Sequence, residues 1–199
     1  MSPRIDPAIL KQQVDALLKT LADINVGGDE MALGEAPASA RAAAVPALDM
    51  AADGGAIDKL VALGSNPQSL RAAQAIAAQR LLAFDREVFP HDGCAITLSV
   101  LMQQAGIEVS DAFPAIELGQ ALQRRGWKRI PVGRQQRGDA GSTCGPVAHH
   151  ETDHIYLVQR EVNDDEMVIA DNQETSPHFR FASGNGKSPT TFFLRAAGA

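Results

Sequence analysis

A chain of 199 residues, of which 45% are hydrophobic, is long enough to bury the core of one domain together with an extension. A net charge of −6 and a pI near 5.3 argue against a nucleic-acid partner. Two cysteines cannot build a disulfide framework, and neither a membrane-spanning apolar stretch nor an apolar secretion signal is recognised. We therefore expect a protein that binds no nucleic acid, spans no membrane and is made in the cytoplasm.

The first predicted helix covers residues 7–24, where apolar side chains recur at steps of three and four. Such a stripe is typical of a face that packs against a partner surface. Residues 25–55 are rich in Gly, Ala, Pro and Ser and show little periodicity. They predict a long loop, with a turn of helix near residues 49–53 as an option.

A second helix is predicted from Pro67 to about Phe84. Asn66 is a typical N-cap residue, and proline suits the first helical position because its missing N–H has no partner there. Neither this helix nor the segment before it carries a candidate catalytic group. We therefore expect residues 1–85 to form a helix-loop-helix extension of a domain formed by residues 86–199.

The helix predicted to begin near Cys94 carries the cysteine of greatest interest. Asp92 is expected to be its N-cap, and Gly106 is expected to end it. A thiol at this position lies at the positive end of the helix dipole, which favours the thiolate form. Cys94 is therefore a candidate nucleophile, and the alternative is a small buried hydrophobic residue.

The periodicity changes from helical to extended after one more helix, predicted between Ser110 and Arg125. A turn signal at residues 163–165 predicts a hairpin between two of the strands that follow. The predicted strands cover residues 127–132, 154–159, 167–170 and 191–195. Helices followed by an antiparallel sheet predict an α+β fold.

Residue types typical of thiol catalysis fall at the ends of these elements. Cys94 opens a helix, His154 begins one strand of the hairpin, and Asp171 and Asn172 end the other. Because the hairpin closes near residues 163–165, its open ends lie side by side and bring the histidine close to Asp171 or Asn172. The set predicts a nucleophile, a base and a polar group that orients the base.

The order of these elements resembles the NlpC-like and CHAP cysteine hydrolases of the papain-like superfamily. The resemblance covers about residues 85–196: a cysteine that opens a helix, a Gly-Asp element, the run His-Ile-Tyr-Leu-Val, and Val-Ile-Ala-Asp-Asn after a turn. It implies a papain-like fold without a cofactor. It also implies Cys94 as nucleophile, His154 as general base and later acid, and Asp171 as the orienting group, with Asn172 as the competing choice.

The same resemblance implies an amidase or endopeptidase that cleaves peptidoglycan peptides through an acyl-enzyme. Because this substrate lies outside the membrane, we expect export by a route without a cleaved signal, as for toxins and phage lysins, and an inhibitor or delivery protein as partner. Two alternatives stay open. One is an inactive papain-like module that binds cell-wall peptide or a protein, and the other is a thiol hydrolase of a different amide.

Further side chains are candidates for the walls of a substrate cleft. They are His91, Asp92, Ser99, Trp127 and Tyr156. Trp127 and Tyr156 fit the core equally well. We expect His178 and Arg180 at the surface, with a place in the cleft as the alternative.

Residues 149–154, together with Cys144 upstream, offer imidazole, carboxylate and thiol groups of the kind that zinc binds. They crowd one loop without a recognisable ligand spacing, so we expect a solvated loop at the edge of the cleft and no metal. In an exported protein, a disulfide between Cys94 and Cys144 would block the proposed nucleophile.

Overall fold

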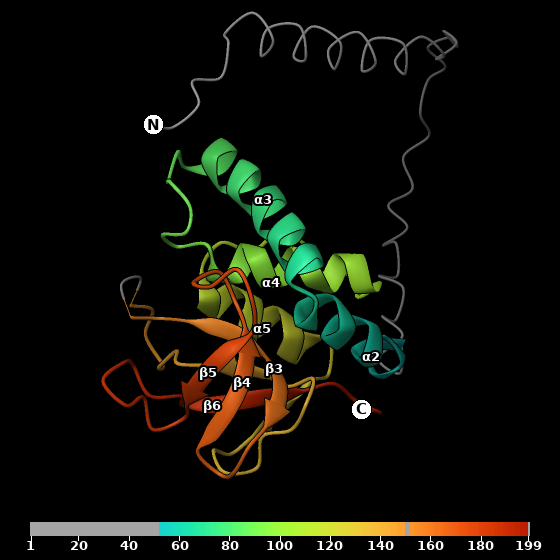
Figure 1. The fold of residues 1–199 in the computed structure, drawn as a ribbon, viewed down its shortest axis with the longest axis vertical. Helices are drawn as coiled ribbons and strands as arrows, with labels where there is room; N and C mark the ends of the chain where they lie inside the picture. Colours follow the sequence, from blue (N-terminus) through green and yellow to red (C-terminus); the bar gives the residue numbers. More distant parts are fainter. Residues whose placement is uncertain (1–51, 150–151, 199) are drawn as a thin grey trace, which may run out of the picture. The chain divides into compact units, whose positions relative to one another are not determined.

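The computed structural model describes residues 52–149 and 152–198, which fall in the compact unit Pro46–Ala199 (Figure 1). The helix predicted at residues 7–24 and most of the loop predicted at 25–55 lie outside the described residues. The helices are α2 (Ala52–Ser65), α3 (Pro67–Phe84), α4 (Cys94–Ala105) and α5 (Ala115–Arg124). The strands are β1 (Lys128–Ile130), β2 (Ala140–Ser142), β3 (Ile155–Glu161), β4 (Glu166–Ala170), β5 (His178–Phe181) and β6 (Phe192–Arg195).

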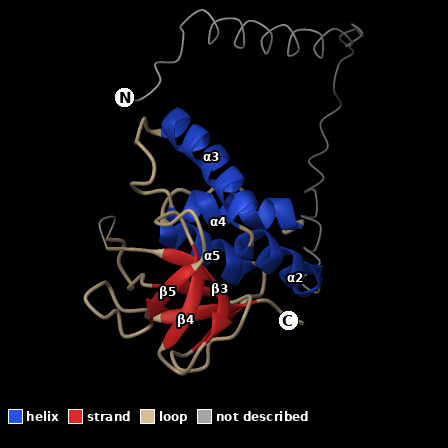
Figure 2. Ribbon diagram, in the orientation of Figure 1, coloured by secondary structure: helices blue, strands red, loops and turns tan. Residues whose placement is uncertain are grey.

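The strands form one antiparallel sheet in the order β1-β6-β2-β3-β4-β5. Figure 2 shows the helices gathered apart from the strands, and the α+β prediction is confirmed. The predicted β3–β4 hairpin is also confirmed: the side chain of Asn163 accepts hydrogen bonds from the N–H groups of Asp165 and Glu166 in its turn. None of the described helices is long and apolar enough to cross a membrane.

Helix α4 lies at the centre of the unit and contacts α2, α3, α5 and β3. Ten of its twelve residues are therefore buried, whereas the sequence pattern predicted one apolar face. Gly106 ends the helix in the left-handed conformation, as predicted. The N-cap prediction was wrong, because Gly93 is the N-cap and Asp92, with φ of 51°, precedes it.

Helix α3 begins as predicted, with the Asn66 side chain accepting from the N–H of Gln68 at 2.8 Å. Helix α2 was not predicted, since glycine is a poor helix former. Packing explains these glycines: a Cβ on Gly54 would lie 2.5 Å from the carbonyl oxygen of Ala197, and one on Gly64 would meet the side chain of Gln159 at 2.2 Å. Glycine therefore lets α2 approach both the C-terminal segment and β3.

Two short strands were also missed. The segment that forms β2 was interpreted as punctuation and loop, because Ala140, Gly141 and Ser142 have low strand propensity. The ring of Tyr156 occupies the space where a Cβ of Gly141 would lie, so a larger residue does not fit. Strand β5 reverses the usual pattern, since Phe179 is exposed and Arg180 is buried.

The core runs across the boundary that we predicted at residue 85. Buried side chains of α2 and α3 join those of α4, α5 and one face of the sheet in a single hydrophobic cluster. A smaller cluster on the other face includes Tyr156, Val158 and Phe193. The described helices before residue 85 therefore share the core of the residues after it.

Asp53 fastens α2 to the rest of the unit. Its carboxylate is 2% exposed, accepts two hydrogen bonds from the Arg125 guanidinium at 2.9 and 2.6 Å, and accepts a third from Trp127 Nε1 at 2.9 Å. The predicted role of Trp127 in a substrate cleft is thus wrong, because its ring is 3% exposed and lies in the core.

We predict that Asp53→Ala lowers the free energy of unfolding by about 3–5 kcal/mol, because it leaves the buried Arg125 charge without a carboxylate. Asp58→Ala is the matched control: it removes a carboxylate of α2 that pairs with Arg137 at the surface, and should cost under about 1 kcal/mol. Urea denaturation measures both. Equal losses in the two variants would contradict the role assigned to Asp53.

Candidate active site

Cys94 is the first residue of α4 and borders two depressions of the surface. The larger is a cleft of about 850 Å³, and the smaller is a pocket of about 110 Å³ lined largely by residues of α3 and α5 and the segments beside them. The thiol is free, and the residue is 7% exposed. Its backbone N–H lies in the first turn of the helix, where no intrahelical acceptor exists. A reacting group in the cleft could therefore meet both the sulfur and this N–H.

His154 immediately precedes β3 and lines the same cleft. The end of β2 holds its backbone from both sides. The N–H of His154 donates to Thr143 Oγ1 at 2.7 Å, and the N–H of Thr143 donates to the carbonyl oxygen of His154 at 2.9 Å. These bonds fix the position from which the imidazole reaches its partners.

The imidazole of His154 lies between Asp171 and Cys94. Its Nε2 is 2.9 Å from Asp171 Oδ2, which leaves Nδ1 as the nitrogen available to the thiol. Burial alone would lower the pKa of His154, but the hydrogen bond to Asp171 and the interaction with Cys94 outweigh burial and raise this pKa to about 9. The site therefore favours a protonated imidazole beside the sulfur.

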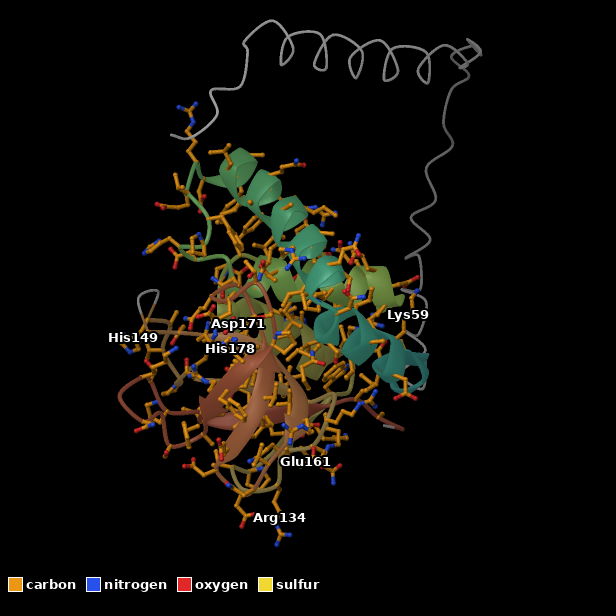
Figure 3. All side chains as sticks on the ribbon, viewed as in Figure 1. Lys59, Arg134, His149, Glu161, Asp171 and His178 are labelled. Atoms are coloured by element: carbon orange, nitrogen blue, oxygen red, sulfur yellow. The ribbon has the colours of Figure 1, made fainter. Side chains whose placement is uncertain are left out.

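Asp171 immediately follows β4 and is held by the segment that follows it and by α3. Its Oδ1 accepts from the N–H of Gln173 at 2.8 Å, and its carbonyl oxygen accepts from Gln74 Nε2 of α3 at 2.8 Å. Burial acts to raise the pKa of Asp171, but the hydrogen bond to His154, the charges of His154 and His178, and the N–H of Gln173 together outweigh burial and lower this pKa. His178 Nε2 lies 3.7 Å from the same carboxylate, and Figure 3 shows Asp171 and His178 close together. The carboxylate is thus kept ionised.

Asn172 has a different partner from Asp171. Its Nδ2 donates to the carbonyl oxygen of Pro90 at 2.6 Å, and it lines the cleft. The geometry thus separates the two candidates for the orienting group: Asp171 contacts His154, whereas Asn172 joins the end of β4 to the loop before Cys94.

The other predicted cleft residues divide into two groups. His91 and Asp92 line the cleft, as predicted. Ser99 is fully buried within α4, so its predicted place in the cleft is wrong. Tyr156 is also fully buried. Its ring centroid lies 5.8 Å from that of His154, so it supports the histidine from within the sheet instead of contacting a substrate.

The cleft contains the cations Arg180 and Lys187, and the sequence had suggested a place in the cleft for Arg180 only as an alternative. Arg180 is buried and lines the cleft, together with Lys187 and Ser188, although we expected Arg180 at the surface. Its strand alternates aromatic and polar residues, and such a pattern predicts that the aromatic residues face inward. The His-Phe-Arg-Phe run was a strand signal, but it indicated the wrong face for Arg180.

Cys144 follows β2 and lies outside both depressions that border Cys94. It is buried, lines a separate depression of about 520 Å³, and is free, as is Cys94. Burial raises the pKa of its thiol to about 11. In the loop considered for zinc, residues 150 and 151 lie outside the described ranges. The described residues contain no group of three or more His, Cys, Asp or Glu side chains arranged so that they could hold a metal ion.

Comparison of the chain with protein-family models, with curated proteins and with solved structures gave no match. The resemblance of residues 85–196 to NlpC-like and CHAP hydrolases therefore stays an expectation.

We predict that the stability contributed by His154 falls as pH rises. Because the pKa of His154 is raised from 6.5 to about 9 in the folded state, the folded chain holds this proton more tightly than the unfolded chain does. The stabilisation should be complete below about pH 6.5 and lost as pH approaches and passes 9.

The measurement is urea denaturation of the unmodified protein and His154→Gln across pH 6 to 10. The difference in unfolding free energy between them should shrink over that range. His149→Gln removes an exposed histidine and is the control, for which we expect no such trend. A difference that stays constant or grows with pH would contradict the prediction.

Proposed function

We propose that this chain is a cysteine hydrolase of amide bonds with a papain-like arrangement of Cys94, His154 and Asp171. The observation that carries the proposal is their convergence: a thiol at a helix N-terminus and an imidazole bonded to a buried carboxylate border one cleft. A nucleophile, a base and a group that orients the base are the minimum set for thiol catalysis. Pairing of β3 with β4 brings His154 and Asp171 to the same face of the sheet, and Cys94 at the start of α4 borders the same cleft as His154.

In the proposed reaction, the Cys94 thiolate attacks the carbonyl carbon of the amide. The N–H of Cys94 at the start of α4 faces the negative oxygen that develops there, a position that the helix dipole also favours. Protonated His154 then donates its proton to the leaving amine, and a thioester to Cys94 forms. Asp171 keeps the imidazole oriented through Nε2 and stabilises its charge.

Water completes the cycle. His154, now neutral, accepts a proton from the water that attacks the thioester, and the carboxylic acid product leaves with the regenerated Cys94 thiolate. Acid and base are thus the same side chain in successive steps, as the raised pKa of His154 allows.

We propose peptidoglycan peptides as the substrate and export as the route to it. Two observations support a peptide: the cleft of about 850 Å³ is open at the surface, and polar side chains from the loop before α4, from β5 and from the segment before β6 line it. The resemblance to NlpC-like and CHAP hydrolases selects the cell-wall peptide among amides.

We predict that Cys94→Ala lowers hydrolysis of purified muropeptides at least about 1,000-fold, because the described residues that line the cleft offer no second thiol. His154→Ala should cause a loss of similar size. Cys144→Ala is the matched control and should stay active, because that thiol lies outside the cleft. Mass spectra of muropeptides before and after incubation report the cleaved bond, and full activity in Cys94→Ala would overturn the proposal.

For the location of the substrate, we predict that expression directed to the periplasm lyses bacterial cells and that cytosolic expression does not. The Cys94→Ala variant, expressed in both ways, separates hydrolysis from general toxicity and should be harmless. Lysis or growth arrest confined to cytosolic expression would point to an intracellular amide instead. Optical density after induction measures each case.

A further inference from the structure

Arg180 carries a buried positive charge into the candidate active-site cleft. It lies on β5, is only 6% exposed, and borders the same cleft as Cys94 and His154. Pairing along the sheet fixes its face, because Arg180 lies opposite Met167 and His178 lies opposite Ile169. Its position is therefore set by the sheet and not by a surface loop.

The described residues supply Arg180 with few hydrogen-bond acceptors. Its Nη2 donates to the carbonyl oxygen of Ser188 at 2.8 Å, and its Nε is fully buried without a partner. Within the described ranges no carboxylate oxygen lies within 4.0 Å of a guanidinium nitrogen of Arg180. In contrast, Arg125 pairs with Asp53 at 2.6 Å and Arg195 pairs with Asp139 at 2.8 Å.

A buried guanidinium is costly without a negative partner, because water can no longer solvate the charge. The ring of Tyr156 offsets part of this cost, since the guanidinium carbon lies 4.8 Å from its centroid. Lys187 also lines the cleft, and its Nζ is 3.2 Å from Gln173 Oε1, an uncharged acceptor. This end of the cleft is therefore cationic and suited to an anion.

The cationic end lies close to the reacting groups. The ring of Tyr156 contacts Arg180 on one side and is a tilted neighbour of the His154 ring, with centroids 5.8 Å apart. Since one ring separates them, the guanidinium lies within about three extended residues of the imidazole. A peptide held at Cys94 can thus place a carboxylate against Arg180.

We propose that Arg180 binds a carboxylate of the substrate, so that the amide attacked by Cys94 belongs to a peptide with a free carboxylate within about three residues of that bond. This inference rests on the proposed function of Cys94 and names the class of substrate. Nη2 of Arg180 donates one hydrogen bond to Ser188, and Nη1 donates none to the described residues. A planar guanidinium edge of this kind suits a carboxylate, which it can bind through two parallel hydrogen bonds.

The test uses electrophiles that differ only in charge. N-iodoacetyl-glycine and N-iodoacetyl-β-alanine carry a carboxylate, and their carboxamides are neutral. Each alkylates a thiolate with loss of iodide. Intact mass gives the rate of labelling of the full chain, and peptide mapping identifies Cys94 as the labelled residue.

The expected result is a ratio of carboxylate to carboxamide rates that falls roughly 10- to 100-fold in Arg180→Gln, the range for a hydrogen bond to a charged group. Taking the ratio cancels any change in the intrinsic reactivity of Cys94. Arg180→Lys keeps the charge and should retain part of the preference. Arg160→Gln makes the same charge change at an exposed position of β3 and should leave the ratio unchanged.

Two results would overturn the inference in distinguishable ways. If Cys94 reacts but Arg180→Gln leaves the ratio unchanged, Arg180 binds no substrate carboxylate and the proposed function stands. If Cys94 reacts with none of the probes, the proposed nucleophile fails and the inference fails with it. Thermal unfolding checks that the variants fold. If Arg180→Gln does not fold, the comparison uses the unmodified chain and Arg180→Lys. The inference is then overturned if carboxylate and carboxamide probes react with Cys94 at the same rate in both proteins.

Discussion

The register of β3 against β4 determines which side chains meet in the cleft. Leu157 pairs with Ala170, so the next residue of the chain, Asp171, comes opposite Tyr156 and diagonal to His154 on the same face. A slip of one residue would turn Asp171 to the other face of the sheet and leave the imidazole without its carboxylate. The same face continues across β4 to Arg180, so the proposed reaction and the proposed anion site depend on one pairing.

The helices before the cysteine support this arrangement. Gln74 of α3 is buried and donates to the carbonyl oxygens of Asp171 and Glu174, at 2.8 and 2.7 Å. The segment that follows β4 is thus held from the helical layer as well as from the sheet. Residues of α3 also line the small pocket beside Cys94. Helix α3 therefore contributes directly to the geometry of the site, and not only to the core.

Local patterns predicted the features that local chemistry controls. The cap at Asn66, the end of α4 at Gly106 and the turn at Asn163 follow from the backbone preferences of single residues. The predicted hairpin was then enough to predict that His154 lies close to Asp171 or Asn172. Choosing Asp171 over Asn172 needed side-chain contacts, which sequence spacing does not give.

Long-range packing determines the features that the sequence did not reveal. Gly54 of α2 and Gly141 of β2 were interpreted as loop signals, but they mark places where the C-terminal segment or the Tyr156 ring comes too close for a Cβ. Arg180 was expected at the surface, where most arginines lie, with a place in the cleft as the alternative. Its burial follows from a cleft whose wall it forms, a property of the folded chain and not of the strand that carries it.

Asn172 and Asp171 are consecutive, yet their side chains bind different parts of the site. Asn172 donates a hydrogen bond to the carbonyl oxygen of Pro90 in the loop before the nucleophile, and Asp171 forms a hydrogen bond with the His154 imidazole. The loop before the nucleophile and the carboxylate that orients the base are therefore connected through a single peptide bond.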